Sequence, residues 1–231
     1  ESGGISCDRC RRRGVLKMIV FGITGGTGAG KTSALRVLEG LGAYLIDCDA
    51  LYYEMLRPGT ALHTAIGDAF GREVFDPAGR LDRQQLGNRV FTHPGELQKL
   101  NGIIYRHLGE EMELRIAGQR AAGARCAAVD GINMIQARQA GFFACDCMVG
   151  VVAPEKLRLR RIMARDHISE EYAQKRIDAQ QSNDFYLEHC DAVLENRYES
   201  PALFEEAAQM FFQDLLRICE KEKENHGKEK A

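Results

Sequence analysis

The sequence lacks a strong net charge, a long apolar run and an apolar opening segment. Its 231 residues carry a formal net charge of −2 at pH 7, which gives no overall attraction to nucleic acid or to an anionic membrane. No apolar stretch approaches the roughly 18 residues that a membrane-spanning helix requires. We therefore expect no membrane span, no secretory signal and no nucleic-acid partner. Cysteines such as Cys48 and Cys126 are expected to be reduced thiols of a cytoplasmic protein.

Two nucleotide-binding signatures are also missing. The glycine-rich segment near residue 25 does not fit G-x-G-x-x-G, which disfavours a dinucleotide-binding dehydrogenase. No N-K-x-D base-reading motif occurs, although residues 76–79 (D-P-A-G) do fit the D-x-x-G pattern of nucleotide-dependent switches. The D-P-A-G segment does not follow a predicted strand. A binding switch thus stays a weaker alternative to an enzyme.

Residues 25–32 (G-G-T-G-A-G-K-T) are the most informative feature that is present, because they fit G-x-x-x-x-G-K-[ST], the phosphate-binding loop of nucleotide hydrolases and kinases. The glycines let successive backbone N–H groups turn inward toward phosphate oxygens. Lys31 is expected to reach the β- and γ-phosphates, and the hydroxyl of Thr32 to ligate Mg²⁺. The predicted nucleotide contacts are Gly25, Gly26, Thr27, Gly28, Ala29, Gly30, Lys31, Thr32 and Ser33.

The flanking residues favour this loop over an incidental glycine-rich turn. Residues 18–23 (M-I-V-F-G-I) form an apolar run typical of a buried parallel strand. Residues 31–41 place leucines at helical spacing and end at Gly42. Strand, loop and helix in this order is the context that a phosphate-binding loop requires.

The whole chain alternates strand and helix patterns, which predicts an α/β fold with a five-stranded parallel sheet and helices on both faces. About 75 residues separate the second and third strands, far more than an ordinary crossover contains, so a helical lobe is inserted there. The predicted strands are 18–23, 43–46, 126–129, 147–152 and 192–194. The predicted divisions are a disordered extension (1–17), a nucleotide-binding core (18–49, 123–153 and 190–219), a helical acceptor lobe (50–122), a lid (154–189) and a charged tail (220–231).

Charged residues lie at the positions where phosphoryl transfer needs them. Asp47 and Asp49 follow the second strand, where one carboxylate can accept the proton of an alcohol while the other caps the next helix. Asp130 follows the third strand and either holds Mg²⁺ through water or caps a helix. Residues 154–189 are basic in their first half, which favours a lid that supplies cations over a merely solvated helix face.

Several longer motifs resemble those of the dephospho-coenzyme A kinase family over about residues 18–218. The phosphate loop is shared by many families, whereas D-P-A-G-R-L-D-R and M-A-R-D at this separation are more specific. The segments that carry the resemblance are 22–32, 45–49 (L-I-D-C-D), 57–60 (R-P-G-T), 76–83 (D-P-A-G-R-L-D-R), 163–166 (M-A-R-D), 168–171 (I-S-E-E), 176–180, and Asp191 with Asn196.

The resemblance implies that ATP phosphorylates the ribose 3′-hydroxyl of dephospho-CoA, giving CoA and ADP in the last step of coenzyme A biosynthesis. ATP and Mg²⁺ are the implied cofactors, and the oligomeric state is left open. The implied roles are Asp49 as base, Lys31 and Thr32 at the phosphates and Mg²⁺, Arg161 and Arg165 as lid arginines, Asn196 near the adenine of ATP, and Arg80, Leu81 and Asp82 in acceptor binding.

Two further interpretations stay open at this stage. A kinase that acts on another nucleotide or a small alcohol shares the phosphate loop and the lid, but not the acceptor-lobe motif. Cys7 and Cys10 form a single C-x-x-C, which is a weak indication of a zinc half-site or redox pair because no second pair accompanies it.

Overall fold

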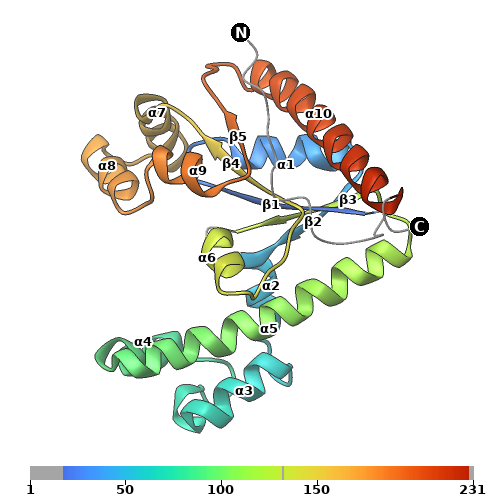
Figure 1. Cartoon of the computed structure of the whole chain (residues 1–231). Helices are drawn as coiled ribbons and strands as arrows, with labels where there is room; N and C mark the ends of the chain where they lie inside the picture. Colours follow the sequence, from blue (N-terminus) through green and yellow to red (C-terminus); the bar gives the residue numbers. More distant parts are fainter. Residues whose placement is uncertain (1–17, 132, 229–231) are drawn as a thin grey trace.

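The computed structural model describes residues 18–131 and 133–228. Its centre is one parallel sheet in the order β2-β3-β1-β4-β5 (Figure 1). The strands are β1 (Ile19–Gly25), β2 (Ala43–Asp47), β3 (Cys126–Asp130), β4 (Cys147–Val152) and β5 (Ala192–Glu195). The predicted α/β class and its five parallel strands are confirmed, each strand ending within two residues of its predicted position. The predicted extension at residues 1–17, with Cys7 and Cys10, lies outside the described residues.

Both faces of the sheet are covered, so β1 is buried along its whole length. Ile19, Phe21 and Ile23 belong to the core beneath α1 (Lys31–Gly40) and α10 (Pro201–Lys228), where the rings of Phe21 and Phe212 lie 6.3 Å apart. Val20 belongs to the core on the other face, beneath α5 (Pro94–Ala121) and α6 (Met134–Gln139). Apolar side chains on both faces explain why β1 has no polar alternation.

Helices fill the chain between β2 and β3, as the spacing predicted. They are α2 (Cys48–Met55), α3 (Ala61–Phe70), α4 (Arg83–Thr92) and α5, with a short 3₁₀ turn η2 (Arg72–Val74). In Figure 1, α3 and α4 lie against α5 on the side away from the sheet. Their apolar side chains form a core of their own.

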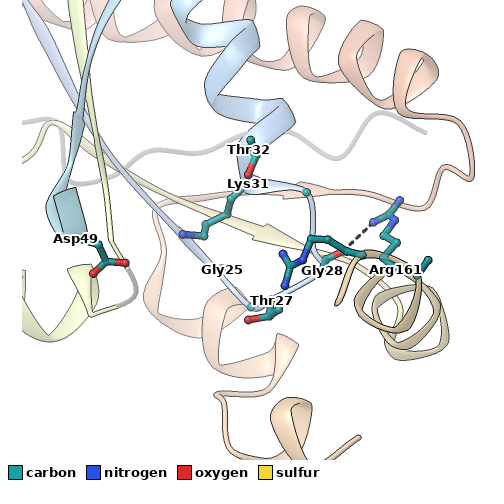
Figure 2. Close-up of a pocket in the computed structure, with 11 residues that line it drawn as sticks. Gly25, Thr27, Gly28, Lys31, Thr32, Asp49 and Arg161 are labelled. Atoms are coloured by element: carbon teal, nitrogen blue, oxygen red, sulfur yellow. Dashed lines mark hydrogen bonds between the residues drawn. The ribbon is translucent and has the colours of Figure 1, made fainter. Parts of the chain in front are cut away.

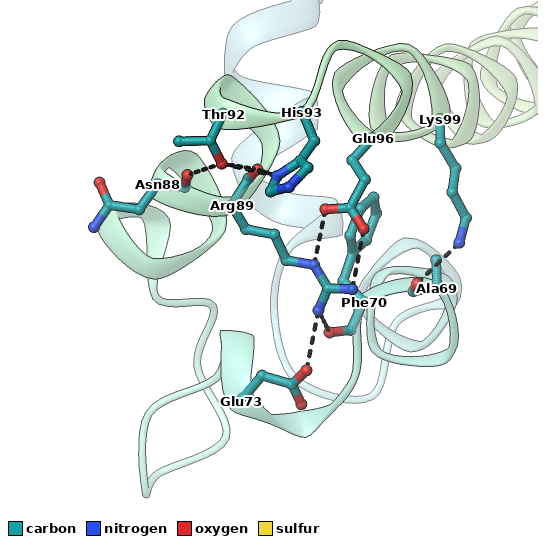
Figure 3. A network of polar contacts seen from close by, with 9 residues as sticks. All are labelled: Ala69, Phe70, Glu73, Asn88, Arg89, Thr92, His93, Glu96 and Lys99. Atoms are coloured by element: carbon teal, nitrogen blue, oxygen red, sulfur yellow. Dashed lines mark hydrogen bonds and ion pairs between the residues drawn. The ribbon is translucent and has the colours of Figure 1, made fainter.

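Arg89 joins three parts of this helical lobe (Figure 3). Its Nε and Nη2 donate to the carboxylate of Glu96 in α5 at 2.9 and 3.1 Å. Its Nη1 donates to the carbonyl oxygen of Phe70 at the end of α3 and to Glu73 in η2, at 2.6 and 3.0 Å. A guanidinium with several donors in one plane suits this bridging position.

The region predicted as a lid consists of α7 (Glu155–Asp166), α8 (Glu170–Asp178) and α9 (Asn183–His189). Ser169 caps α8 by accepting a hydrogen bond from the backbone N–H of Tyr172, as expected for that helix start. Ile162 of α7 packs with Ala173 and Ile177 of α8 in a small separate core. That these helices move as a lid stays a prediction.

The C-terminal helix is longer than the sequence pattern predicted. The segment predicted as a charged tail, residues 220–231, is helical as far as Lys228, because α10 continues beyond its apolar face. Glu and Lys have high helix propensity, which the absence of apolar residues does not remove. Glu220 also pairs with Arg125 at 2.8 Å, which ties the helix to the start of β3. Residues 229–231 lie outside the described residues.

Two helices of the described chain, α5 and α10, have 28 residues each. Charged side chains interrupt both, and none of the helices in the described ranges combines the length and the hydropathy needed to cross a membrane.

Candidate active site

The predicted phosphate loop connects β1 to α1, and its conformation favours glycine, most clearly at Gly25 and Gly30. Gly25 and Gly30 have φ values of 147° and 111°, in the region that side chains disfavour. A Cβ atom on Gly25 would collide with the carbonyl oxygen of Val151, and one on Gly30 with the side-chain amide of Asn196. The glycine pattern therefore reflects both backbone geometry and close packing of the loop against β4 and β5.

A cavity of about 600 Å³ lies in front of this loop. It is lined by residues of the loop, Lys31 included, together with Asp49, Arg161 and Arg165, so the structure brings these four predicted catalytic side chains to one place. Figure 2 shows Asp49 on one side of the cavity and Arg161 on the other, with the side chain of Lys31 reaching between them. Ala29 and Ser33 of the predicted nucleotide contacts do not line the cavity; Ala29 is buried beneath it.

Asp47 and Asp49 lie in different surroundings, although only two residues separate them in the sequence. The carboxylate of Asp47 caps α2 by accepting hydrogen bonds from the backbone N–H groups of Asp49 and Ala50, at 2.9 and 3.0 Å. The carboxylate of Asp49 accepts no hydrogen bond from any described residue and lines the cavity. Of these two acids, Asp49 is therefore the one placed to receive a proton from a molecule in the cavity.

Lys31 and Asp130 form an ion pair, with 2.7 Å between Nζ and Oδ1. Both side chains are about one-fifth exposed, at 23% and 21%, so the pair is shielded from bulk water but can be reached by a ligand. Thr32, the second residue of α1, lines the cavity in front of the phosphate loop. Asp130 does not cap a helix, and its carboxylate lies at the carboxyl end of β3, where ligands of open α/β sheets bind.

Asn196 lies beneath the loop rather than along the cavity wall. It is 2% exposed, donates from Nδ2 to the carbonyl oxygen of Ala29 at 2.9 Å, and accepts from Nη2 of Arg161 at 3.1 Å. Arg161 also donates to the carbonyl oxygens of Gly28 and Tyr198, at 3.0 and 2.7 Å. Asn196 and Arg161 thus hold the loop in place, and the predicted contact between Asn196 and adenine stays a prediction.

A second set of contacts ties the loop to α7 and to the end of α8, and sequence reasoning assigned it no role. Arg158, only 3% exposed, donates from Nε to the carbonyl oxygen of Thr27 at 2.9 Å and from Nη2 to Gln180 at 2.9 Å. Gln180 in turn accepts from the backbone N–H of Thr27 and donates to its hydroxyl, at 2.8 and 2.6 Å. The sequence does place Arg158, Arg161 and Arg165 at i, i+3 and i+7, on one face of a helix. That shared face is the sequence pattern from which a contact between α7 and the loop could have been predicted.

The surroundings of the α7 arginines and of Cys48 shift the pKa values of these groups in different directions. Burial lowers the pKa of Arg158 and Arg161 from the ordinary value of 12.5. Arg165 is more exposed, and its hydrogen bond to Asp166 raises its pKa. Burial, followed by the charges of Asp130 and Asp49, raises the pKa of the Cys48 thiol to about 12, so this thiol stays protonated at neutral pH.

The predicted acceptor contacts lie apart from the cavity. Asp82 caps α4 by accepting from the backbone N–H groups of Gln84 and Gln85, both at 3.0 Å, and Arg80 pairs with Asp76 at 2.8 Å. Leu81 pairs with Phe75 through a single antiparallel β-bridge between their backbones. These residues hold the turn between η2 and α4, and their contact with an acceptor stays a prediction.

Comparison with known proteins agrees with the predicted resemblance. Residues 19–215 match the family model described as dephospho-CoA kinase. The dephospho-CoA kinases of Geobacter metallireducens and Geobacter sulfurreducens are 35% and 33% identical to this chain, each over 78% of it and over 89% and 90% of their own lengths.

Solved structures show the same fold. A Thermus thermophilus protein, TT1252, superimposes with a TM-score of 0.65 at 25% identity, over 87% of this chain and 97% of its own. The dephospho-CoA kinase from Campylobacter jejuni has a TM-score of 0.53 at 19% identity, over 86% of this chain and 97% of its own. The family model and the relatives match most of the chain, and the cavity combines a glycine loop, an acid and arginines. The chain therefore belongs to the dephospho-CoA kinase family.

Proposed function

We propose that the protein transfers the γ-phosphoryl group of ATP to the ribose 3′-hydroxyl of dephospho-CoA, giving CoA and ADP. The observation that carries the proposal is one cavity lined by the phosphate loop with Lys31, by Arg161 and Arg165, and by Asp49, whose carboxylate has no hydrogen-bond partner among the described residues. This arrangement supplies a place for the donor and a base for the acceptor. The family to which the chain belongs supplies the acceptor's identity.

The loop and the cations beside it bind the donor. Backbone N–H groups of residues 25–32 surround the phosphates, and Lys31 turns from Asp130 to the β- and γ-phosphates once they arrive. Arg165 faces the cavity from α7 with a largely exposed side chain, 61%, and can turn toward the transferring group. These positive charges stabilise the negative charge that spreads over the phosphoryl oxygens in the transition state.

Asp49 acts on the acceptor. As the 3′-oxygen attacks the γ-phosphorus, the bond from that phosphorus to the β,γ-bridging oxygen breaks, and ADP leaves with the bond's electron pair. The proton of the 3′-hydroxyl passes to the carboxylate of Asp49. Because Asp47 is engaged in capping α2, it does not compete for this role.

The residues present also fit a magnesium ion. The hydroxyl of Thr32 and the carboxylate of Asp130 are hard oxygen donors, and Mg²⁺ prefers such ligands with water completing its shell. When bound, the ion would neutralise part of the phosphate charge. Thr32 and Asp130 are thus the proposed metal contacts, Asp130 through water.

The proposal is tested by measuring ADP release from Mg-ATP with and without dephospho-CoA. We expect release to depend on the acceptor and the product to carry a new phosphate on the ribose 3′-oxygen, identified by phosphorus NMR and mass spectrometry. Slow hydrolysis that ignores the acceptor would point to a nucleotide-dependent switch. Phosphorylation of other nucleotides at a higher kcat/KM than dephospho-CoA would instead reassign the acceptor.

A further inference from the structure

A second cavity, of about 190 Å³, adjoins the active site at Asp49. Asp49 lines both cavities, so the second one begins where the acceptor hydroxyl is expected. Its other walls come from α2, α5, the start of α6 and the loop that follows α6. These elements lie together on one side of the sheet in Figure 1.

The walls of this second cavity are aromatic and amide-bearing. Tyr105 of α5 and Phe142 lie with their ring centroids 5.6 Å apart and their planes tilted by 32°, and Tyr52 of α2 adds a third ring. Asn101 and Asn133 supply amide groups whose side chains make no hydrogen bond with any described residue. Flat apolar faces with free donors and acceptors at their edge suit a planar heteroaromatic ring.

The charges of the cavity exclude a phosphate group. None of its described lining residues is a lysine, arginine or histidine, and Asp49 contributes a negative charge at one end. A diphosphate would therefore be both unpaired and repelled there. The part of the acceptor that enters this second cavity must therefore be uncharged.

We propose that this cavity binds the purine base of the acceptor nucleotide, an inference that rests on the proposed function. The base is joined to the same ribose that carries the 3′-hydroxyl, so it lies beside Asp49 whenever that hydroxyl does. The pantetheine arm begins only beyond two phosphates. In ATP, the β- and α-phosphates separate the transferred γ-phosphoryl group from the adenine. The adenine of ATP therefore lies on the far side of the loop and does not compete for this cavity. Tyr105 and Phe142 are then specificity-determining residues for the acceptor.

The test is a double-mutant-type cycle in which one change is a substitution of Tyr105 and the other is a change of the acceptor's base. We compare wild-type protein, Tyr105→Ala and Tyr105→Leu with two acceptors, dephospho-CoA and an analogue in which uracil replaces adenine. Leu114→Ala is the matched control, because Leu114 lies on the same helix, is 67% exposed and does not line the cavity. The KM for ATP and thermal melting report on the integrity of each variant.

We expect Tyr105→Ala to lower kcat/KM for dephospho-CoA about 10-fold, the usual effect of removing an aromatic ring that stacks on a base. The loss for the smaller uracil acceptor should be at least about 3-fold less, and the KM for ATP should stay within about 2-fold of wild type. Tyr105→Leu keeps the apolar bulk and removes the aromatic face, so it should show the same pattern more weakly. Leu114→Ala should resemble wild type with both acceptors.

Equal losses with both acceptors would assign the cavity to a part that they share, such as the pantetheine arm, and would overturn the proposal. So would unchanged kcat/KM in both Tyr105 variants. If the wild-type protein failed to phosphorylate dephospho-CoA, the proposed function would fall. Calorimetric titration of the same two nucleotides would then still decide whether the cavity distinguishes the bases.

Discussion

The buried amide of Asn196 offers a test of how the phosphate loop is held. Replacing Asn196 by Leu removes the hydrogen bond to the carbonyl oxygen of Ala29 and the two that its Oδ1 accepts, from Arg161 and from the backbone N–H of Tyr198. The carbonyl loses its side-chain donor in a site that is 2% exposed, whereas Arg161 retains two carbonyl partners. A buried polar group left unsatisfied costs about 1–3 kcal/mol.

The lost hydrogen bonds should together lower the free energy of unfolding by about 2–4 kcal/mol. For a chain of this size each kcal/mol corresponds to about 2–4 °C, so the Tm without nucleotide should fall by about 5–15 °C. Differential scanning calorimetry without ATP measures this, and the KM for ATP should rise because the loop is less well ordered. The exposed change Asn88→Leu is the control and should alter stability by no more than about 0.5 kcal/mol.

A different result would show that Asn196 acts directly on the nucleotide. If Asn196→Leu melted within about 2 °C of wild type, less than the smallest expected shift, and lost only its preference for ATP over GTP, the amide would be a base contact. The loop-holding role derived from its hydrogen bonds would then be refuted.

Three other outcomes can be measured on single variants or on the wild-type chain. Lys31→Ala should lower kcat/KM for ATP by at least about 10²-fold in the coupled assay, because both the ground state and the transition state lose a phosphate cation; unchanged kinetics would contradict phosphate binding by the loop. Arg89 holds the pKa of Glu96 below its ordinary value of 4.5, so the stability from this pair is present above about pH 4.5 and is lost as the pH falls through the lowered pKa. The difference in unfolding free energy between wild type and Arg89→Met, measured in urea, should therefore shrink from pH 6 to pH 3, and a constant difference would argue against the ion pair. Burial raises the pKa of Cys48 to about 12, so iodoacetamide at pH 8 should alkylate this thiol slowly in the folded protein and fast in urea. Mass spectrometry measures both rates, and equal rates would show that burial does not protect the thiol.

The sheet was predictable because its evidence is local. Each strand is a short run of apolar and β-branched residues bounded by glycine or by a charged residue, as in Ile19–Gly25 and Cys147–Val152. The loop motif and the acids after the strands were also found, because the carboxyl ends of parallel strands share one edge of the sheet. That one of Asp47 and Asp49 caps the next helix was also anticipated. The residue pattern alone did not say which one, and the role of Asp49 as base, which the resemblance implied, stays a prediction.

The remaining parts of the site depend on contacts between distant residues. Thr27 meets Arg158 and Gln180 across separations of 131 and 153 residues, and a helical spacing of arginines cannot reveal which carbonyl each one reaches. Tyr105 meets Phe142 only because α5 and the loop after α6 cover the same part of the sheet. Tertiary packing decides these positions, and local patterns do not encode it.

The most direct test of the account is the turnover of Asp49→Asn beside Asp47→Asn in Mg-ATP and dephospho-CoA. Asparagine caps a helix about as well as aspartate, so Asp47→Asn should retain near-normal turnover. Asp49→Asn should bind ATP normally and lose about 10²- to 10⁴-fold in kcat, because the proton of the hydroxyl has no acceptor. Near-normal kcat in Asp49→Asn, with the loss in Asp47→Asn instead, would contradict the placement of the base.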